Sequence, residues 1–214
     1  MWGLTTKGSS SRRPVMSKTI CIFGDSIVWG AHDPENGGWV NLLRNYCERQ
    51  DISVYNCGIS GDNTDDLLKR FKSEAGARKP DVVVFAIGIN DSQYTGEREN
   101  TRVSKDSFGA NLEALIEQAK KFTDRILFVG LTPVEENKVM PISWSDENKN
   151  YDNININSFN SLIKKTAEKF NISFLDIVSL LVAEELEDGL HPNSNGHKKM
   201  FERVRDFLLE NKII

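Results

Sequence analysis

The sequence predicts an α/β fold, a three-layer α/β/α sandwich in which a five-stranded parallel sheet lies between helices. Short apolar runs rich in β-branched and aromatic residues recur along the chain, as in strands that are buried on both faces. The segments between them carry apolar residues at helical spacing. Strands that alternate with amphipathic helices form parallel sheets through right-handed crossovers, so these two observations together indicate the fold class.

The strands are identified by their unbroken apolar composition and by the turn residues that end them. The clearest run is Val82-Val83-Val84-Phe85-Ala86-Ile87, which stops at Gly88. A similar run stops at Gly24-Asp25-Ser26. We expect the five strands over residues 19–23, 53–56, 82–87, 125–130 and 172–175.

The helices are identified by apolar residues three or four positions apart and by polar residues that can cap a first turn. Leu112, Leu115 and Ile116, for example, have the spacing of one helix face. We expect helices over 39–49, after a cap at 63 or 64, from about 107, around 159–170, and from a cap at 193 or 194. Residues 134–156 are expected to form a long loop, and such loops are usually functional or mobile.

Composition and charge exclude several classes of protein. The 214 residues are 39% hydrophobic and 27% charged, which suits one globular domain over 18–214. Residues 1–17 contain three consecutive serines and no apolar run, so we interpret them as a flexible leader. A net charge of −4 leaves no basic footprint for nucleic acid, and no apolar run reaches membrane-spanning length.

Three cysteines have a spacing that fits no zinc site and no redox motif. Two of them, Cys21 and Cys57, lie in or beside expected strands. We therefore expect buried free thiols and a cytoplasmic location, where thiols stay reduced.

Chemistry-bearing residues follow the ends of the expected strands. The carboxyl ends of parallel strands lie on one edge of a sheet, so Ser26, Gly61, Asn90, Asp188 and His191 are expected to meet in one cleft. A serine hydroxyl needs a base, and an imidazole has a suitable pKa for that task. Asp188 could accept a hydrogen bond from the other ring nitrogen, and Gly61, Asn90 and the Ser26 N–H could donate to an oxyanion.

Each of these residues also has a purely structural interpretation. Ser26 or Asp25 could cap the helix that follows, and Gly61 and Asn90 could be ordinary turn residues. Asp25 is assigned the structural role, because Asp is a preferred N-cap.

The remaining candidates are two histidines and two aromatic residues. We expect His32 in a solvated loop, because no residue near it in the sequence pairs with it, although it could border the cleft. His197 is expected on the surface at the start of the last helix. Trp144 and Tyr151 either line a pocket or pack the long loop onto the body of the protein.

Four blocks of the sequence, taken in order, resemble those of the SGNH hydrolases, also called the GDSL esterase/lipase family. They are Gly24-Asp25-Ser26, Gly61 in a Gly-Asp-Asn turn, Gly88-Ile89-Asn90-Asp91 and Asp188-Gly189-Leu190-His191-Pro192, and the resemblance covers about residues 18–210. Ile27 stands where the name motif has leucine, a change that keeps size and hydrophobicity.

The resemblance implies a flavodoxin-like sheet, no metal and no cofactor. It implies that Ser26 is the nucleophile and a donor to the oxyanion, with Gly61 and Asn90 as the other donors. It also implies that His191 is the base and Asp188 its partner.

The sequence thus predicts a serine esterase that hydrolyses carboxylic esters of small molecules through an acyl-enzyme. The polar character of residues 134–156 favours short acyl chains. A lysophospholipase or thioesterase and a carbohydrate deacetylase are alternatives of the same family, and a non-catalytic small-ligand module is another. A phosphate or nucleotide binder is disfavoured because the chain has no GxGxxG motif and no P-loop.

Overall fold

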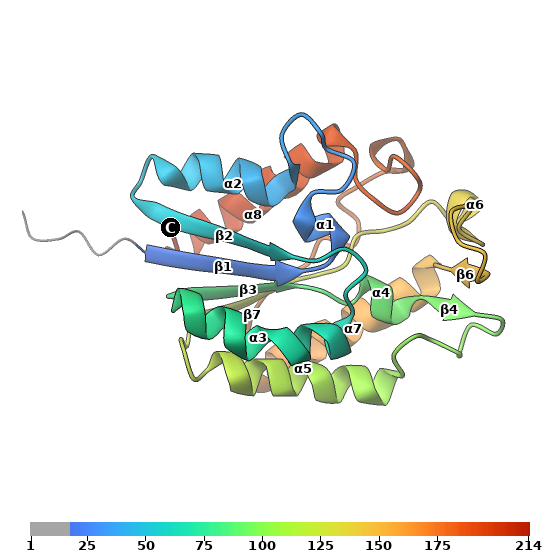
Figure 1. Cartoon of the computed structure of the whole chain (residues 1–214), viewed down its shortest axis with the longest axis horizontal. Coiled ribbons are helices and arrows are strands. Elements are labelled where there is room, and N and C mark those ends of the chain that lie inside the picture. Colours follow the sequence, from blue (N-terminus) through green and yellow to red (C-terminus); the bar gives the residue numbers. More distant parts are fainter. Residues whose placement is uncertain (1–17) are drawn as a thin grey trace, which may run out of the picture.

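The structure is a computed structural model that describes residues 18–214 (Figure 1), so the leader expected at 1–17 lies outside the described residues. Five parallel strands form one sheet in the order β2-β1-β3-β5-β7, which confirms the predicted sheet. This order is the flavodoxin-like one. The strands are β1 Lys18–Gly24, β2 Ile52–Gly58, β3 Val82–Ala86, β5 Ile126–Val129 and β7 Ser173–Leu175.

The neighbouring strands β2, β1 and β3 end at the same level of the sheet. In the register of the sheet, Gly24 of β1 is opposite Gly58 of β2 and Ala86 of β3. A Cβ atom on Gly24 would lie 2.2 Å from the carbonyl oxygen of Ala86, so only glycine fits between these strands. The turns that follow the three strands therefore begin side by side.

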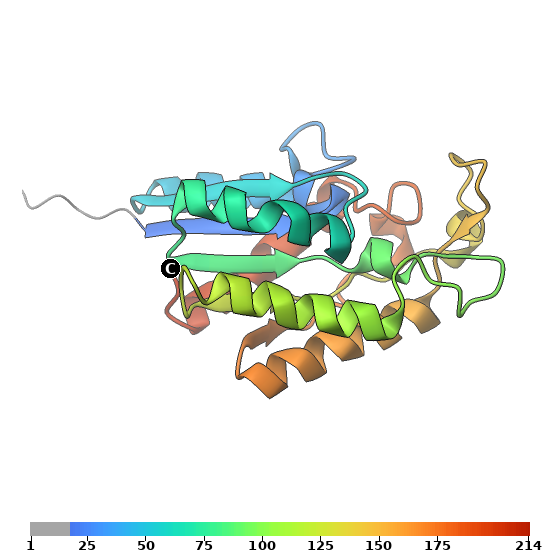
Figure 2. The same cartoon turned by 60° about the horizontal axis from the view of Figure 1, so that its bottom comes forward.

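Helices cover both faces of the sheet (Figure 2). On one face, α2 (Gly38–Glu48) packs against α8 (Ser194–Glu210), and on the other α5 (Lys105–Ala119) lies between its neighbours α3 (Thr64–Arg78) and α7 (Asn153–Phe170). Buried phenylalanines fill the space between β-sheet and helices, and the rings of Phe85 and Phe128 stack with their centres 5.2 Å apart. The layers are those that the alternating pattern predicts.

The predicted caps hold the helices as the sequence indicates. Asn63 accepts a hydrogen bond from the N–H of Asp66 at 3.0 Å and begins α3. Asn193 accepts from the N–H groups of Asn195 and Gly196 and begins α8. Because a capped first turn has fewer orphan N–H groups, these polar residues fix where each helix starts.

The long loop expected over 134–156 is shorter than predicted. Asp152 accepts a hydrogen bond from the N–H of Asn155 at 2.7 Å, so α7 begins at Asn153. The rest of the segment contains α6 (Glu136–Val139) and the strand β6 (Lys149–Asn150), which pairs antiparallel with β4 (Tyr94–Thr95). The alternating Asn and Ile residues of 153–157 hide the start of the helix from a search for apolar periodicity.

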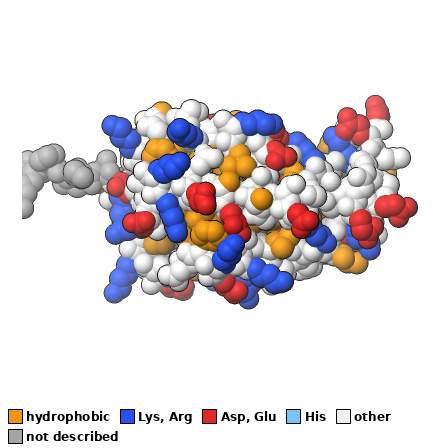
Figure 3. All heavy atoms as spheres, turned by 90° about the horizontal axis from the view of Figure 1, so that it is seen from below, with side chains coloured by type: hydrophobic (Ala, Val, Ile, Leu, Met, Phe, Trp, Pro, Cys, Tyr) orange, Lys and Arg blue, Asp and Glu red, His pale blue; other side chains and the backbone are white. Residues whose placement is uncertain are grey.

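The outer faces of α3, α5 and α7 are polar, as amphipathic helices on a sheet require. Figure 3 shows Lys and Arg side chains interspersed with Asp and Glu on the face seen from below. An ion pair between Lys169 and Glu113, at 2.6 Å, joins α7 to α5. Among the helices of residues 18–214, none has the length and apolar character needed to cross a membrane.

All three cysteines are free and buried, which confirms the prediction made from their spacing.

Candidate active site

Ser26 lies directly beyond β1, at the first position of the short helix α1 (Ser26–Trp29). The cap of this helix is Asp25, whose Oδ1 accepts a hydrogen bond from the N–H of Ile27 at 2.9 Å. The structural role predicted for Asp25 is thus confirmed, and the interpretation of Ser26 as the helix cap is wrong. Because Asp25 satisfies the helix terminus, the Ser26 hydroxyl is left available for other partners.

The Ser26 hydroxyl lies at one end of a continuous hydrogen-bonded chain. Its Oγ is 2.8 Å from Nε2 of His191, and Nδ1 of His191 is 2.7 Å from Oδ2 of Asp188. An ionised carboxylate can only accept, so Nδ1 carries the proton and Nε2 accepts from the serine. This arrangement can transfer the serine proton to the ring while the carboxylate fixes the tautomer.

The turn from Asp188 to His191 is stabilised by hydrogen bonds to the Asp188 carboxylate. Oδ1 accepts the N–H groups of Leu190 at 3.0 Å and His191 at 2.8 Å, which leaves Oδ2 for the ring. Gly189 has φ +89°, in the left-handed region that glycine adopts without strain. Burial alone would raise the pKa of Asp188, but the hydrogen bonds from the ring and N–H of His191 hold it well below its usual range. The carboxylate is therefore ionised throughout the neutral range.

The side-chain amide of Asn90 lies beside the turn that contains Gly61. Asn90 belongs to the short helix α4 (Ile89–Ser92), which follows β3, and its Nδ2 donates to the carbonyl oxygen of Asp62 at 2.9 Å. Gly61, with φ +83°, immediately precedes Asp62. An amide group carries two hydrogens, so one remains available on Asn90.

Tyr151, which the sequence assigns either to a pocket lining or to packing of the long loop, makes a contact with Asn90 that the sequence analysis did not predict. Its side chain is buried, and its hydroxyl lies 2.9 Å from Oδ1 of Asn90 and 3.2 Å from Oε1 of Gln93. A hydroxyl that donates to Oδ1 of Asn90 turns the amide nitrogen the opposite way, toward Asp62. The structure thus gives the long segment a definite contact with the site, although nothing in the local sequence indicates it.

Arg70 of α3 joins the first two turns of the site. Its Nε donates to Oδ2 of Asp62 at 2.7 Å, and its Nη2 donates to the carbonyl oxygen of Gly24 at 3.1 Å. Both acceptors are next to candidate site residues, Gly61 and the segment that ends in Ser26. The guanidinium therefore fixes the separation of the two turns, which its rigid fork of donors suits.

His197 is buried, so the prediction of a surface position is wrong. Its Nδ1 accepts from the N–H of Trp39 at 3.3 Å, and its Nε2 donates to the carbonyl oxygen of Ala31 at 2.9 Å. Burial lowers the pKa of this imidazole. The signal was present in the sequence, because His197 is in helical register with the buried Met200 and Val204.

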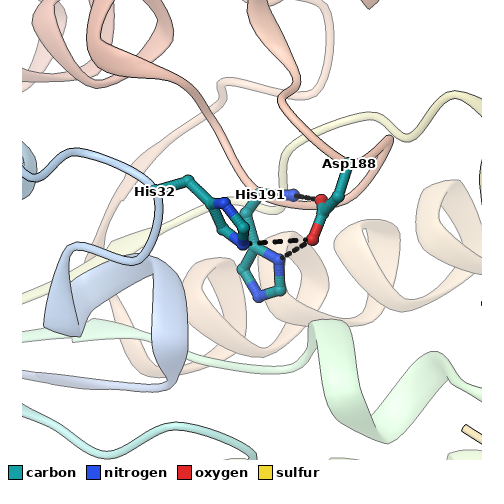
Figure 4. Close-up of side chains that lie close together, drawn as sticks. All are labelled: His32, Asp188 and His191. Carbon is teal, nitrogen blue, oxygen red and sulfur yellow. Dashed lines mark hydrogen bonds and ion pairs between the residues drawn. The ribbon is translucent and has the colours of Figure 1, made fainter. Parts of the chain in front are cut away.

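His32 lies in an exposed loop that borders the site, as predicted, but it contacts residues of the site, so the expectation that it has no partner is wrong. Figure 4 shows its ring against that of His191, with both rings directed at Asp188. The ring centres are 5.1 Å apart, and Nε2 of His32 is 3.3 Å from Oδ2 of Asp188. The sequence could not reveal this contact because the partners lie near opposite ends of the chain.

Two open cavities border these residues. One, of about 760 Å³, is lined by residues that include Trp29, His32 and Asn193. The other, of about 640 Å³, is lined by residues that include Gly61 and Arg102. Trp29 is 59% exposed, and Trp144 is 50% exposed with its ring centre 6.4 Å from that of His191. Both rings are thus accessible to solvent, and Trp144 lies near the ring of His191.

Burial raises the pKa of Asp25 from an ordinary value of 3.8 to about 7, and this has a measurable consequence for stability. A raised pKa means that folding favours the protonated acid, so the folded state loses stability as pH rises from about 4 to 7. Asp25→Asn keeps an N-cap acceptor and removes this loss. We expect the variant to be more stable than the native protein at pH 8 by up to about 4 kcal/mol.

Urea unfolding at pH 5 and pH 8 measures this effect. The advantage of Asp25→Asn should shrink at pH 5, whereas Asp124→Asn, at an exposed position, should shift neither curve. Equal stability of Asp25→Asn and the native protein at both pH values would contradict the prediction.

Comparisons with known proteins bear on the same residues. The model of the GDSL-like Lipase/Acylhydrolase family matches residues 22–199. An acetylxylan esterase of Geobacillus stearothermophilus is 28% identical over 89% of this chain and 92% of its own length. An uncharacterized lipoprotein of Bacillus subtilis is 32% identical over 55% of this chain, and the match spans about half of that relative (49%). A solved structure of a catalytic mutant of the acetylxylan esterase has a TM-score of 0.70 at 23% identity, over 90% of this chain and 93% of that one, which shows the same fold.

Proposed function

Since the chain belongs to the GDSL-like lipase/acylhydrolase family and is an ester-hydrolysing enzyme, we propose that it cleaves carboxylic esters through an acyl-enzyme on Ser26. The observation that carries this proposal is the hydrogen-bonded chain from Ser26 through His191 to Asp188. The acetylxylan esterase supports it, because its solved catalytic mutants replace a serine, an aspartate and a histidine three positions after that aspartate. Asp188 and His191 have the same spacing.

In the proposed reaction, Ser26 attacks the ester carbonyl carbon while Nε2 of His191 takes its proton. Asp188 holds the ring and stabilises the imidazolium that forms. His191 then gives the proton to the leaving alcohol as the acyl-enzyme is made. A water molecule, deprotonated by the same nitrogen, releases the carboxylic acid and restores the serine.

The negative charge that develops on the carbonyl oxygen needs donors in fixed positions. We assign this role to the N–H of Ser26, the N–H of Gly61 and the second hydrogen on Nδ2 of Asn90. Support comes from the position of Asn90, whose amide is held at the Gly61–Asp62 turn. Loss of one such donor typically lowers kcat by about 10²- to 10³-fold.

Tyr151 acts in this scheme as a positioning residue for Asn90. Tyr151→Phe removes the hydroxyl that orients the amide, and we expect kcat to fall about tenfold with little change in KM, because one buried hydrogen bond contributes about 1 to 1.5 kcal/mol. Steady-state kinetics on p-nitrophenyl acetate measures the split between kcat and KM. Tyr55→Phe is the matched control, because Tyr55 is an exposed tyrosine on β2. A loss of thermal stability in Tyr151→Phe with kcat unchanged would show that the hydroxyl serves only the fold.

We propose that short acyl chains are preferred. The cavity beside Gly61 supports this, because the residues that line it include Gln93, Thr95, Arg102 and Lys149, whose polar groups suit a small or polar substrate. On p-nitrophenyl esters of two to twelve carbons, kcat/KM should be highest at two to four carbons and fall at least about tenfold by eight. Activity that rises with chain length would favour a lysophospholipase or thioesterase instead.

A carbohydrate deacetylase is the second candidate, because Trp144 is exposed near His191, Trp29 is exposed and lines the same cavity as His32, and sugar rings stack on such aromatic faces. The acetylxylan esterase is a relative with this activity in its name. Acetate release from acetylated xylo-oligosaccharides, compared with p-nitrophenyl acetate, distinguishes the two. A higher kcat/KM on the sugar ester would select the deacetylase. Labelling of the native protein by a fluorophosphonate would exclude a non-catalytic binding module.

We also propose a cytoplasmic location. Three free, buried thiols support it, because proteins of oxidising compartments more often form disulfides. One relative is a lipoprotein, so fractionation of cells that express the full chain is the appropriate test. Recovery in the membrane fraction would overturn this location.

A further inference from the structure

We propose that His32, Asp188 and His191 form a binding site for a divalent cation of the Zn²⁺ type, and that the bound cation blocks ester hydrolysis. Two imidazoles and a carboxylate are ligands that zinc prefers. The three side chains come from two segments far apart in the chain and converge on one oxygen, Oδ2 of Asp188 (Figure 4). One ligand atom from each residue lies within 4.8 Å of the other two.

The two contacts that Oδ2 of Asp188 makes with the histidine nitrogens are close to the edge length of a tetrahedral site, and the two nitrogens lie within 4.8 Å of each other. Ligand atoms at about 2.0 to 2.1 Å from zinc are about 3.3 Å apart along each edge of the tetrahedron. Nε2 of His32 and Oδ2 of Asp188 are already 3.3 Å apart, which is long for a hydrogen bond. The 2.7 Å contact between Nδ1 of His191 and Oδ2 would open by about 0.6 Å as the metal replaces the proton between them.

His32 is held in place and accessible. Its neighbour Asp33 accepts hydrogen bonds from Oγ of Ser194 at 2.7 Å and from the N–H of Gly38 at 3.1 Å, which fix the loop against α8 and α2. The His32 side chain is 41% exposed and lines the cavity of about 760 Å³. A cation can therefore enter from solvent and keep water as its fourth ligand.

The other side chains that zinc prefers, histidine and cysteine, are buried in the protein. The remaining histidine, His197, is fully buried, and the three cysteines are buried as well. Mg²⁺ and Ca²⁺ prefer sets of oxygen ligands, so the two imidazoles select against them.

A cation in this site would stop the proposed reaction through the tautomer of His191. Coordination by Nδ1 moves the ring proton from Nδ1 to Nε2, with no net loss of a proton. Nε2 then faces Ser26 as a donor and has no lone pair to accept the serine proton. The Asp188 carboxylate is engaged by the metal at the same time, so the serine is no longer activated.

The binding step is tested without reference to activity. In metal-free Ser26→Ala, isothermal titration with zinc chloride should show one site per chain. Adding His32→Asn should weaken this site at least about tenfold, as expected for loss of a ligand. Asn is chosen because His32 has φ 63°, a conformation that Asn tolerates. Glu187→Gln is the control, because Glu187 lines the same cavity but is not one of the three ligands.

The inhibition step is tested with the native nucleophile, each variant being compared with its own metal-free rate. Zinc should inhibit hydrolysis of p-nitrophenyl acetate, a chelator should restore it, and magnesium at equal concentration should have no effect. The zinc concentration that halves the rate should rise at least about tenfold in His32→Asn and stay unchanged in Glu187→Gln.

The inhibitory part of this inference rests on the proposed function, and the two fail separately. Unchanged zinc sensitivity in His32→Asn, or no zinc binding to Ser26→Ala, would overturn the site while leaving the esterase intact. Zinc binding by a chain that hydrolyses no ester would overturn the proposed function and the inhibition, and keep the binding site.

Discussion

Ser26→Ala should lower kcat for ester hydrolysis by about five to six orders of magnitude while KM changes little. The hydroxyl that forms the acyl-enzyme is lost. The oxyanion donors and the substrate contacts remain, and they support only a small residual rate. The substitution removes one hydrogen bond to Nε2 of His191 and leaves the Asp25 cap of α1 in place. We therefore expect the fold to be kept.

A fluorophosphonate probe gives an independent readout of the same change. The native chain should be labelled, and Ser26→Ala should not. Ser60→Ala is the matched control, because Ser60 is an exposed serine in the neighbouring turn, and it should be labelled and active like the native protein. Residual turnover within a hundredfold of the native rate in Ser26→Ala would mean that another group is the nucleophile.

His191→Gln should have an effect of the same order, because without the imidazole no group takes the serine proton. Asp188→Asn should cost less, about 10⁴-fold, since the imidazole remains but its tautomer is no longer fixed. The kcat values on p-nitrophenyl acetate, with thermal unfolding to check the fold, should therefore fall in the order native, Asp188→Asn, His191→Gln. A His191→Gln variant that is more active than Asp188→Asn would reverse the assigned roles.

The fold was predictable because its strands are buried on both faces. Such strands appear in the sequence as unbroken apolar runs, and β3 is the clearest example, with Val82 to Phe85 all buried. The short strands β4 and β6 were not predictable, because two residues carry no period. The start of α7 was missed for a related reason. The polar residue Asn155 is buried in its first turn, where it hydrogen bonds with Asp152 and Arg98, so the apolar period of the helix begins only later.

The site was predictable where it follows strand ends. Ser26, Gly61 and Asn90 come after β1, β2 and β3, and the shared level of these strand ends brings their turns together. The contacts of His32 and Tyr151 were not predictable, because loops outside the sheet bring them to the site by tertiary packing alone. His197 was a misjudged residue, since its spacing from Met200 already indicated the buried face of α8.

The contacts of Arg70 connect α3 to the candidate site in a way that the sequence of the helix does not indicate. The helix contributes no atom to bond making or breaking, yet its guanidinium ties the strand end before the nucleophile to the turn that carries a candidate oxyanion donor. Lysine, whose three donors share one nitrogen, lacks the fixed separation of donors with which Nε and Nη2 of Arg70 reach these two acceptors. A change in the length or direction of α3 would therefore move the turn that contains Gly61 relative to Ser26. A redesign of the protein surface has to keep Arg70 for this reason, although its helix lies outside the sheet.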